Sequence, residues 1–310
     1  MNNRIKLALE IFVVGMVWGT SFVATTAILK QVNILQYLSL RWGMAGLACL
    51  IFVALGIFKV DYRGKSKGAI LLLMALQPCI YATLETKGLD MTTASEASII
   101  LALLPITIAL ASSLLLKEKI RKNIIVAAII CIAGVMFTVL FDEGFETSGK
   151  LLGYVILYIC VLCGAAYTII GNRVGGAYNP LEIVVAISVG GGVFFTLAAI
   201  LKGEYFQGIT VVMEDVKTLT LIVYLGVFCS VLCFYLYNDI NNKLIPSMTS
   251  LFVENTVTLV GGISGVIVNG DAIGVYKVIG VLMLISGIAY LSMSERKDKE
   301  KEKIRIASGL

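Results

Sequence analysis

The sequence predicts an all-α integral membrane protein, with ten transmembrane helices arranged as two inverted five-helix repeats around a central cavity. Three observations lead to this prediction. Apolar runs long enough to cross a bilayer alternate with short polar joints along the chain. Basic residues collect in every second joint, and a motif in the fourth apolar run recurs in the ninth.

The composition is typical of a membrane protein. Of the 310 residues, 58% are hydrophobic and 15% are charged, and the mean hydropathy is +0.93. Soluble domains are closer to half apolar, and about a quarter of their residues are charged. The first apolar run, residues 8–29, is too long for the core of a removable signal peptide and no small-residue cleavage site follows it, so we expect it to be retained as a span.

Ten apolar runs are long enough to cross the membrane, since a spanning helix needs about 20 apolar residues. Turn and charge signals separate them, such as residues 61–65 and 178–180. The predicted spans are residues 8–29, 37–56, 69–86, 92–116, 124–141, 151–171, 181–201, 219–238, 244–268 and 273–291.

The distribution of basic residues predicts the orientation. If the N-terminus is cytoplasmic, 18 of the 25 Lys and Arg residues lie on the cytoplasmic side, and 6 lie outside. Arg41 lies within a span. Cytoplasmic loops of membrane proteins carry an excess of Lys and Arg, so this asymmetry predicts that both termini are cytoplasmic and that the number of spans is even. We expect a multi-pass protein of the cell (cytoplasmic) membrane.

An internal repeat relates the two halves of the chain. Residues 95–100 of the fourth span align with residues 247–252 of the ninth at an offset of 152. The predicted repeats are residues 1–145 and 146–293, followed by a charged cytosolic tail at 294–310. Five spans per repeat is an odd number, so the second repeat must enter the membrane upside down, as in many secondary transporters.

Several motifs resemble those of the drug/metabolite transporter superfamily, in particular its ten-helix EamA type. They are Trp18-Gly19-Thr20-Ser21-Phe22, Leu40-Arg41-Trp42, the segment from Thr92 to Ser98, Pro105 within the same span, and Leu116-Lys117-Glu118-Lys119 after it. The resemblance covers about residues 8–292. The order and spacing of these motifs together are more specific than any one of them.

The resemblance implies a basket in which spans 1–4 and 6–9 surround a cavity and spans 5 and 10 are peripheral. Members of the family export amino acids, drugs and other small metabolites, and some import them. Gly19-Thr20-Ser21 also resembles the small multidrug resistance proteins, but Met16 stands where those proteins have an essential glutamate. Their carboxylate-exchange mechanism therefore does not transfer directly.

Glu254 is the clearest candidate for a functional residue. It lies ten residues into the ninth span, about 15 Å from its start at ~1.5 Å per residue, near the bilayer midplane. Ionisable groups at that depth are expensive and often functional. Thr258, one turn on, belongs to the same polar face. The alternative is a structural glutamate that is ion-paired, or protonated and hydrogen-bonded, between helices.

The third span carries a second candidate. Gln77, Tyr81 and Glu85 recur every four residues and share one helix face, and Pro78 removes a backbone donor from that helix. Glu85 is expected either to contact substrate or to have a structural role, paired with Arg41 or at the membrane interface, and both alternatives stay open.

Aromatic and hydroxyl side chains complete the predicted site. Trp18 and Ser21 share a face of the first span, and Tyr167 holds a comparable place in the sixth. The predicted substrate-binding residues are Glu254, Trp18, Ser21, Tyr81, Glu85, Tyr167 and Thr258. Tyr237 and its neighbours at the end of span 8 are interpreted as anchors at the membrane interface. Three further carboxylates lie near span ends, where they are expected to reach water: Glu10, Glu96 and Glu182.

The sequence gives little support for a metal site, a cofactor site or nucleic-acid binding. The chain has no His, nucleotide-binding loop or Ser/His/Asp set, and the Cys160-x-x-Cys163 pair lies in an apolar run, so neither a metal nor a cofactor is expected. The net charge of +5 reflects orientation rather than nucleic-acid binding.

We therefore predict a monomeric secondary transporter that works by alternating access. Its partners would be the lipid bilayer, a small cationic, zwitterionic or neutral solute such as an amino acid or amine, and protons if transport is coupled, with export favoured. The alternatives are a membrane-embedded lipid-modifying enzyme and a non-transporting scaffold or receptor.

Overall fold

The computed structural model describes residues 3–115, 122–141, 148–271, 274–287, 289–290 and 293. Within these ranges the chain is helical and contains no β-strand. The tail at 294–310, the boundary between the predicted repeats and the motif at 116–119 lie outside the described residues.

The first half begins with two long helices, and a loop of residues 55–66 follows them. The next span combines three consecutive helical segments, and the fourth is divided in two. The helices are α1 (Asn3–Leu29), α2 (Ile34–Ala54), α3 (Lys67–Met74), the π-helix η1 (Ala75–Tyr81), α4 (Ala82–Asp90), α5 (Ala94–Leu101), α6 (Leu104–Leu115) and α7 (Lys122–Leu140).

The rest of the chain includes a short amphipathic helix, α10, in the joint between the predicted spans 7 and 8. The helices are α8 (Ser148–Val174), α9 (Pro180–Leu201), α10 (Tyr205–Glu214), α11 (Val216–Val223), the π-helix η2 (Tyr224–Leu232), α12 (Cys233–Lys243), α13 (Pro246–Ser264) and the π-helix η3 (Gly265–Asn269). The next helical stretch covers residues 275–287.

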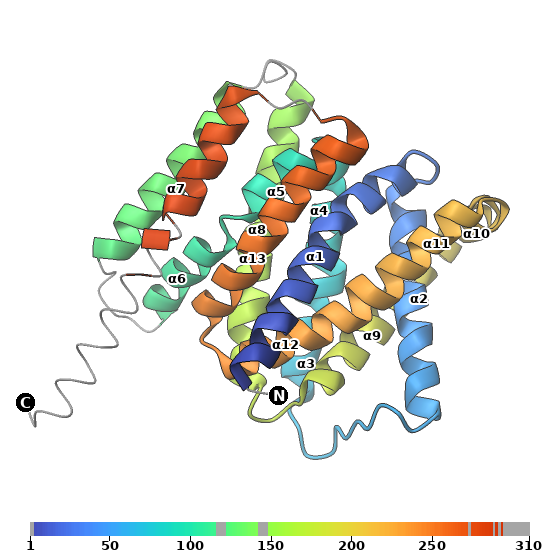
Figure 1. Cartoon of the computed structure of the whole chain (residues 1–310). Coiled ribbons are helices and arrows are strands. Elements are labelled where there is room, and N and C mark those ends of the chain that lie inside the picture. The colour runs from blue at the N-terminus through green and yellow to red at the C-terminus, as the bar shows by residue number, and fades with distance from the viewer. Residues whose placement is uncertain are drawn as a thin grey trace, which may run out of the picture.

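Eight helices of the described chain are long and apolar enough to cross a membrane. They correspond to the predicted spans 1–4 and 6–9. The regions of spans 5 and 10 contain shorter apolar helices, Ile125–Phe137 and Val275–Gly287. These two lie side by side at one edge of the bundle (Figure 1), where the Cys131 thiol contacts the backbone oxygen of Leu284 at 3.7 Å.

The predicted fourth span is confirmed as a membrane-spanning stretch, Ala94–Leu114, but a break divides it into two helical segments. α5 ends at Leu101 and α6 begins at Leu104. Pro105 has no backbone N–H, and its ring clashes with the carbonyl four residues earlier, so an uninterrupted α-helix is unfavourable at this point.

π-Helical stretches interrupt the spans that α3 and α11 begin. η1 contains Pro78, which cannot complete the α-helical hydrogen-bond ladder. η2 contains no proline; there the Ser230 hydroxyl donates to the backbone oxygen of Leu225, five residues earlier, at 2.9 Å. π-Helical turns are rare and occur frequently at functional sites.

Helices α2 and α9 cross at a closely packed contact, which small residues make possible. A Cβ atom at Gly192 of α9 would lie 2.8 Å from the backbone oxygen of Trp42, and one at Gly46 of α2 would lie 3.1 Å from the backbone oxygen of Ser188. Such approach without side chains is typical of helix contacts in membranes.

Replacing Gly192 by Ala should therefore separate α2 from α9. We expect a destabilisation of about 1–3 kcal/mol, as for other overpacked interiors, measured as a lower thermal midpoint of the purified protein. Gly262→Ala is the matched control, since no atom lies within 4 Å of the position a Cβ would take there. Equal midpoints for the two variants would contradict the close crossing.

Candidate functional site

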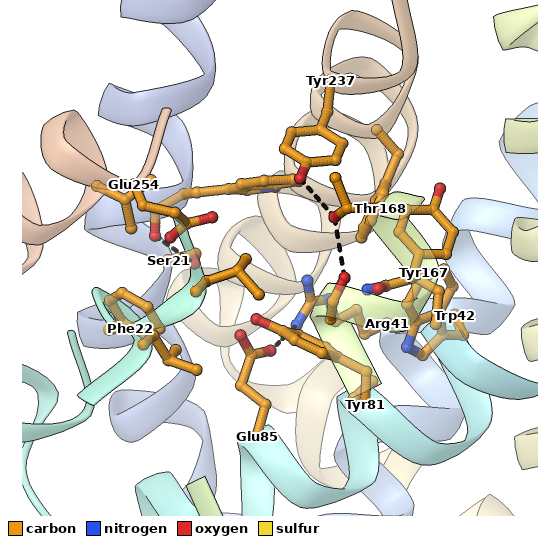
Figure 2. A pocket seen from close by; sticks show the side chains of 18 residues that line it. Ser21, Phe22, Arg41, Trp42, Tyr81, Glu85, Tyr167, Thr168, Tyr237 and Glu254 are labelled. Carbon is orange, nitrogen blue, oxygen red and sulfur yellow. Dashed lines mark hydrogen bonds and ion pairs between the residues drawn. The ribbon is translucent and has the colours of Figure 1, made fainter. Parts of the chain in front are cut away.

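A pocket of about 50 Å³ lies inside the bundle, where α1, α2, α4, α8, α12 and α13 converge (Figure 2). Seven of the 18 residues that line it are aromatic, and three are charged. The charged residues are Arg41, Glu85 and Glu254, and the aromatic ones are Trp18, Phe22, Trp42, Tyr81, Tyr167, Phe234 and Tyr237.

The structure brings together six of the seven predicted site residues. Trp18, Ser21, Tyr81, Glu85, Tyr167 and Glu254 all line the pocket. Thr258 does not. It is buried at the contact with α5, where its hydroxyl donates to the backbone oxygen of Ser98 at 3.3 Å. Substrate binding by these residues stays a prediction.

Arg41 is held by several partners. Its Nη1 donates to the Tyr37 hydroxyl at 3.0 Å and lies 3.9 Å from a Glu85 carboxylate oxygen. Its Nε donates to the Ser230 hydroxyl at 3.0 Å, which joins α2 to η2. The guanidinium also lies 5.7 Å from the centre of the Trp42 ring. Of the two alternatives for Glu85, pairing with Arg41 is therefore present, and Glu85 also lines the pocket.

The surroundings of Glu254 differ from those of Arg41. Its side chain points into the pocket (Figure 2), and only 7% of the residue is exposed. Among the residues that the structure describes, none donates a hydrogen bond to this carboxylate or forms an ion pair with it. The ion-paired form of the structural alternative is thus not observed in the described chain.

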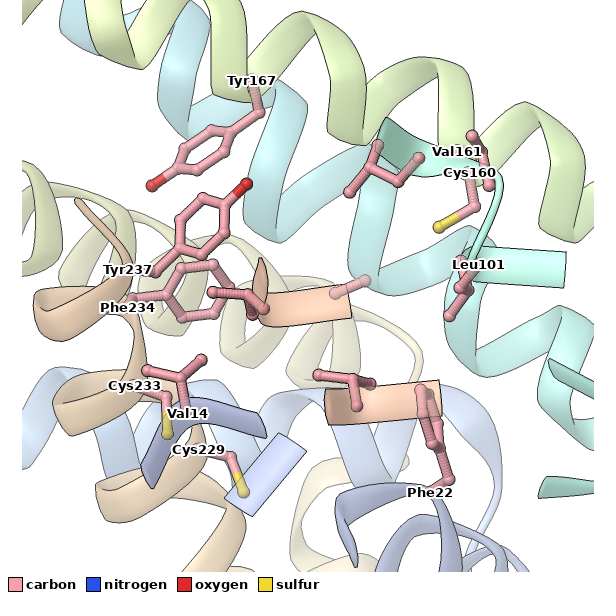
Figure 3. Close-up of a cluster of buried hydrophobic side chains, with 14 of the residues drawn as sticks. Val14, Phe22, Leu101, Cys160, Val161, Tyr167, Cys229, Cys233, Phe234 and Tyr237 are labelled. Atoms are coloured by element: carbon pink, nitrogen blue, oxygen red, sulfur yellow. The ribbon is translucent and has the colours of Figure 1, made fainter. Parts of the chain in front are cut away.

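An aromatic wall joins α1 to α12. The Trp18 ring lies 5.1 Å from that of Phe234 and 5.2 Å from that of Tyr237, centre to centre, and Tyr167 packs edge-on against Phe234 at 6.2 Å. Figure 3 shows Phe234, Tyr237 and Tyr167 together in the buried core. Such edge-to-face and tilted contacts are favourable for aromatic pairs.

Hydrogen bonds fix the orientation of this wall. The indole Nε1 of Trp18 donates to the backbone oxygen of Cys229 at 3.0 Å. The Tyr237 hydroxyl bonds that of Thr168 at 2.8 Å, and the Asn238 amide donates to the Tyr167 hydroxyl at 2.9 Å. These side chains are therefore positioned within the pocket rather than free to rotate.

The interpretation of Tyr237 as an interface anchor is wrong, because it is buried and lines the pocket. Phe234 was missed altogether. A sequence signal was present: Tyr237, Asn238 and Asn241 place polar groups on the face of α12 that also carries Phe234, and polar groups inside a span usually face the interior of the bundle.

The carboxylates near the span ends do not reach water as expected. Glu96, at the start of α5, is 2% exposed. Its Oε1 lies 3.3 Å from the Nζ of Lys277 and 3.4 Å from the Nζ of Lys150. Glu96 also caps its own helix with Thr93. We call Glu96, Lys150 and Lys277 the α5 ion cluster.

A similar arrangement lies at the start of α9. Glu182 is 2% exposed and accepts from Lys65 at 2.5 Å. The Tyr62 hydroxyl donates to the backbone oxygen of Glu182 at 2.8 Å. Burial, and secondarily the negative charge of Glu182, raises the pKa of Tyr62 to about 12. We call Glu182, Lys65 and Tyr62 the α9 ion cluster; a third contact, between Glu10 and Lys243 at 3.0 Å, joins α1 to α12.

In the described part of the chain, no three His, Cys, Asp or Glu side chains are grouped to hold a metal ion. The seven thiols are all free, including those of Cys160 and Cys163.

The model of the EamA-like transporter family matches the chain twice, over residues 6–140 and 151–293. The chain belongs to this family. It is therefore a multi-pass membrane protein of the transporter class, an EamA-type permease of the drug/metabolite transporter superfamily, as the motifs around Trp18 and Arg41 indicated.

Relatives and a solved structure agree with this assignment. The uncharacterized transporter YcxC of Bacillus subtilis is 25% identical over 289 residues, 91% of each chain. An uncharacterized transporter of Archaeoglobus fulgidus is 23% identical over 296 residues, 96% of this chain and all of that one. A crystal structure of a protein with 16% identity matches with a TM-score of 0.68 over 94% of this chain and 98% of its own, which shows the shared fold.

Proposed function

We propose that the protein is a secondary transporter that carries a small cationic, zwitterionic or neutral metabolite across the cytoplasmic membrane by alternating access. One observation carries the proposal: a polar and aromatic pocket lies inside a bundle of membrane-spanning helices and contains a carboxylate with no partner in the described chain. Intramembrane carboxylates that face a cavity mark solute and proton pathways. In the proposal, six of the seven predicted residues form this site, and Thr258 does not belong to it.

The proposed architecture is ten helices in two inverted repeats, residues 1–145 and 146–293. Reciprocal contacts support it. At the start of α2, the Asn33 amide donates to Glu204 in the joint after α9, at 3.1 Å. At the start of α9, Glu182 accepts from the backbone N–H of Asp61, in the joint after α2, at 3.0 Å. The π-helices η1 and η2 occupy corresponding spans, and the family model matches each half separately.

Alternating access requires that the pocket open to each side of the membrane in turn. The chain crosses the bundle three times between the starts of α5 and α9 (α5 with α6, then α7, then α8), so the two ion clusters lie at opposite ends, on either side of the pocket. In the proposed cycle, each cluster closes its own end and separates when that end opens. Export and proton coupling belong to the same proposal.

Transport by purified protein in liposomes tests the function. We expect counterflow of at least one member of a panel of amines, amino acids and neutral metabolites, with no chemical change to the solute. Product formation without flux would instead favour a lipid-modifying enzyme, and binding without flux or product a receptor or scaffold. Empty liposomes and liposomes with heat-denatured protein are the controls.

The proposed orientation makes a separate prediction. Because basic residues concentrate on one side, we expect both termini in the cytoplasm. A C-terminal epitope tag should be inaccessible to antibody in intact cells and accessible after permeabilisation. Labelling of intact cells would contradict the ten-span arrangement.

A further inference from the structure

The charged side chains that line the pocket differ in how many partners they already have. Arg41 is the only basic residue among those that line it, and its guanidinium already contacts Tyr37, Glu85 and Ser230. One carboxylate, Glu85, faces this guanidinium. Two carboxyl groups and one guanidinium leave one carboxyl group without a basic partner within the lining.

This remaining carboxyl group belongs to Glu254. The residue is more than nine-tenths buried, its carboxylate points into the pocket, and it has neither an ion-pair partner nor a hydrogen-bond donor among the described residues (Figure 2). A buried carboxylate without a partner is costly, whereas a carboxylate that a cation can approach gains that partner on binding. The pocket is therefore complementary to a single positive charge.

The surroundings of Glu254 extend this argument from charge to shape. Trp18, Phe234 and Tyr237 present a continuous aromatic surface to the same pocket, and hydrogen bonds from Trp18 and Tyr237 fix their rings. Aromatic faces attract organic ammonium groups and pack against apolar bodies, but they offer nothing to a carboxylate.

We propose that the pocket selects organic monocations: an amine whose ammonium pairs with Glu254 and whose apolar body lies against Trp18, Phe234 and Tyr237. The inference rests on the proposed function and narrows it, because it excludes zwitterions and anions as preferred solutes. A solute carboxylate would need Arg41, where it would compete with the Glu85 carboxylate for a guanidinium that already donates to Tyr37 and Ser230.

The chain supplies its own probe for a test. It contains two tryptophans, Trp18 and Trp42, and both line the pocket. Tryptophan emission of the purified protein in detergent therefore reports on this site. The ligands are isoamylamine, leucine, isocaproate and isoamyl alcohol, which share a branched apolar body and differ in charge. We expect isoamylamine to bind at least ten-fold more tightly than each of the other three.

The variant Glu254→Gln keeps the size of the side chain but cannot carry the charge. We expect it to lose this preference, so that isoamylamine and isoamyl alcohol bind equally weakly. The matched control is Glu214→Gln, at an exposed position at the end of α10, which should retain the wild-type ranking. Thermal unfolding checks that both variants are folded, and the ranking on the wild-type protein tests the proposal without any variant.

Binding of leucine or isocaproate as tight as that of the amine, absence of any amine response, or amine binding by Glu254→Gln at wild-type affinity would each overturn the proposal. Failure here is distinguishable from failure of the proposed function. Counterflow of leucine without amine preference would overturn the selectivity and leave transport in place. Amine binding that depends on Glu254 without any flux would overturn transport and leave the site assignment in place.

Discussion

Glu254→Gln is expected to reduce amine counterflow in liposomes by at least about ten-fold, which corresponds to ~1.4 kcal/mol, close to the lower end of the range for a hydrogen bond to a charged group. The replacement keeps the shape of the side chain and its ability to hydrogen-bond, so the fold should be retained. What it removes is the only pocket carboxylate of the described chain that has no partner.

The same variant should also change the response of transport to pH. A proton and an amine compete for the wild-type carboxylate, because a neutral carboxyl group no longer attracts an ammonium group. Wild-type flux should therefore fall as the pH is lowered, while the residual flux of Glu254→Gln should not vary in this way. Arg41 and Glu85 also face the pocket, and both are retained in the variant.

Counterflow measured over a series of pH values, equal on both sides of the membrane, decides this prediction. Glu214→Gln serves again as the control. Wild-type flux and an unchanged pH profile in Glu254→Gln would mean that Glu254 is structural and that the proposed coupling should be abandoned.

Arg41→Met is expected to have the largest effect on stability, a loss of about 3–5 kcal/mol, as when one member of a buried ion pair is removed. The guanidinium connects α2 with α4 and η2 through Glu85 and Ser230, and the side chain is only 7% exposed. Without it, the Glu85 carboxylate would remain in the bundle uncompensated. A strongly lowered thermal midpoint, or loss of folded protein, is the expected measurement.

A second substitution separates charge from packing. Combining Arg41→Met with Glu85→Gln removes both charges, so the double variant should recover a substantial part of the lost stability. Arg63→Met, in the exposed loop after α2, should leave the midpoint unchanged. If the double variant is no more stable than Arg41→Met, Glu85 is not the group that Arg41 stabilises.

The course of the chain through the bilayer could be predicted in large part because it depends on local properties. Apolar runs identified the eight long helices, since each run must bury its backbone polar groups within its own helix. The signature around Trp18 and Arg41 identified the family for a similar reason, because its residues are near neighbours in sequence.

Local chemistry can also be misread when its effect depends on neighbours. Pro105 lay in a run predicted as one helix and instead separates α5 from α6. Pro78 removes a backbone donor from the third span, and the chain there forms η1. In both places a proline removes a backbone donor, but the packing around it decides how the remaining groups are satisfied.

The sequence by itself determined that this chain is a helical membrane protein of the EamA-like family, and it identified Glu254 as a charge that needs an explanation. Only the tertiary structure decided which partners the charged groups have. Arg41 and Glu85 face one another across α2 and α4, Glu96 and Glu182 find lysines far away in the chain, and Glu254 finds none among the described residues. The physical reason is range: crossing a bilayer is a property of each segment, whereas an ion pair in a medium of low dielectric depends on which segments the fold brings within a few ångströms.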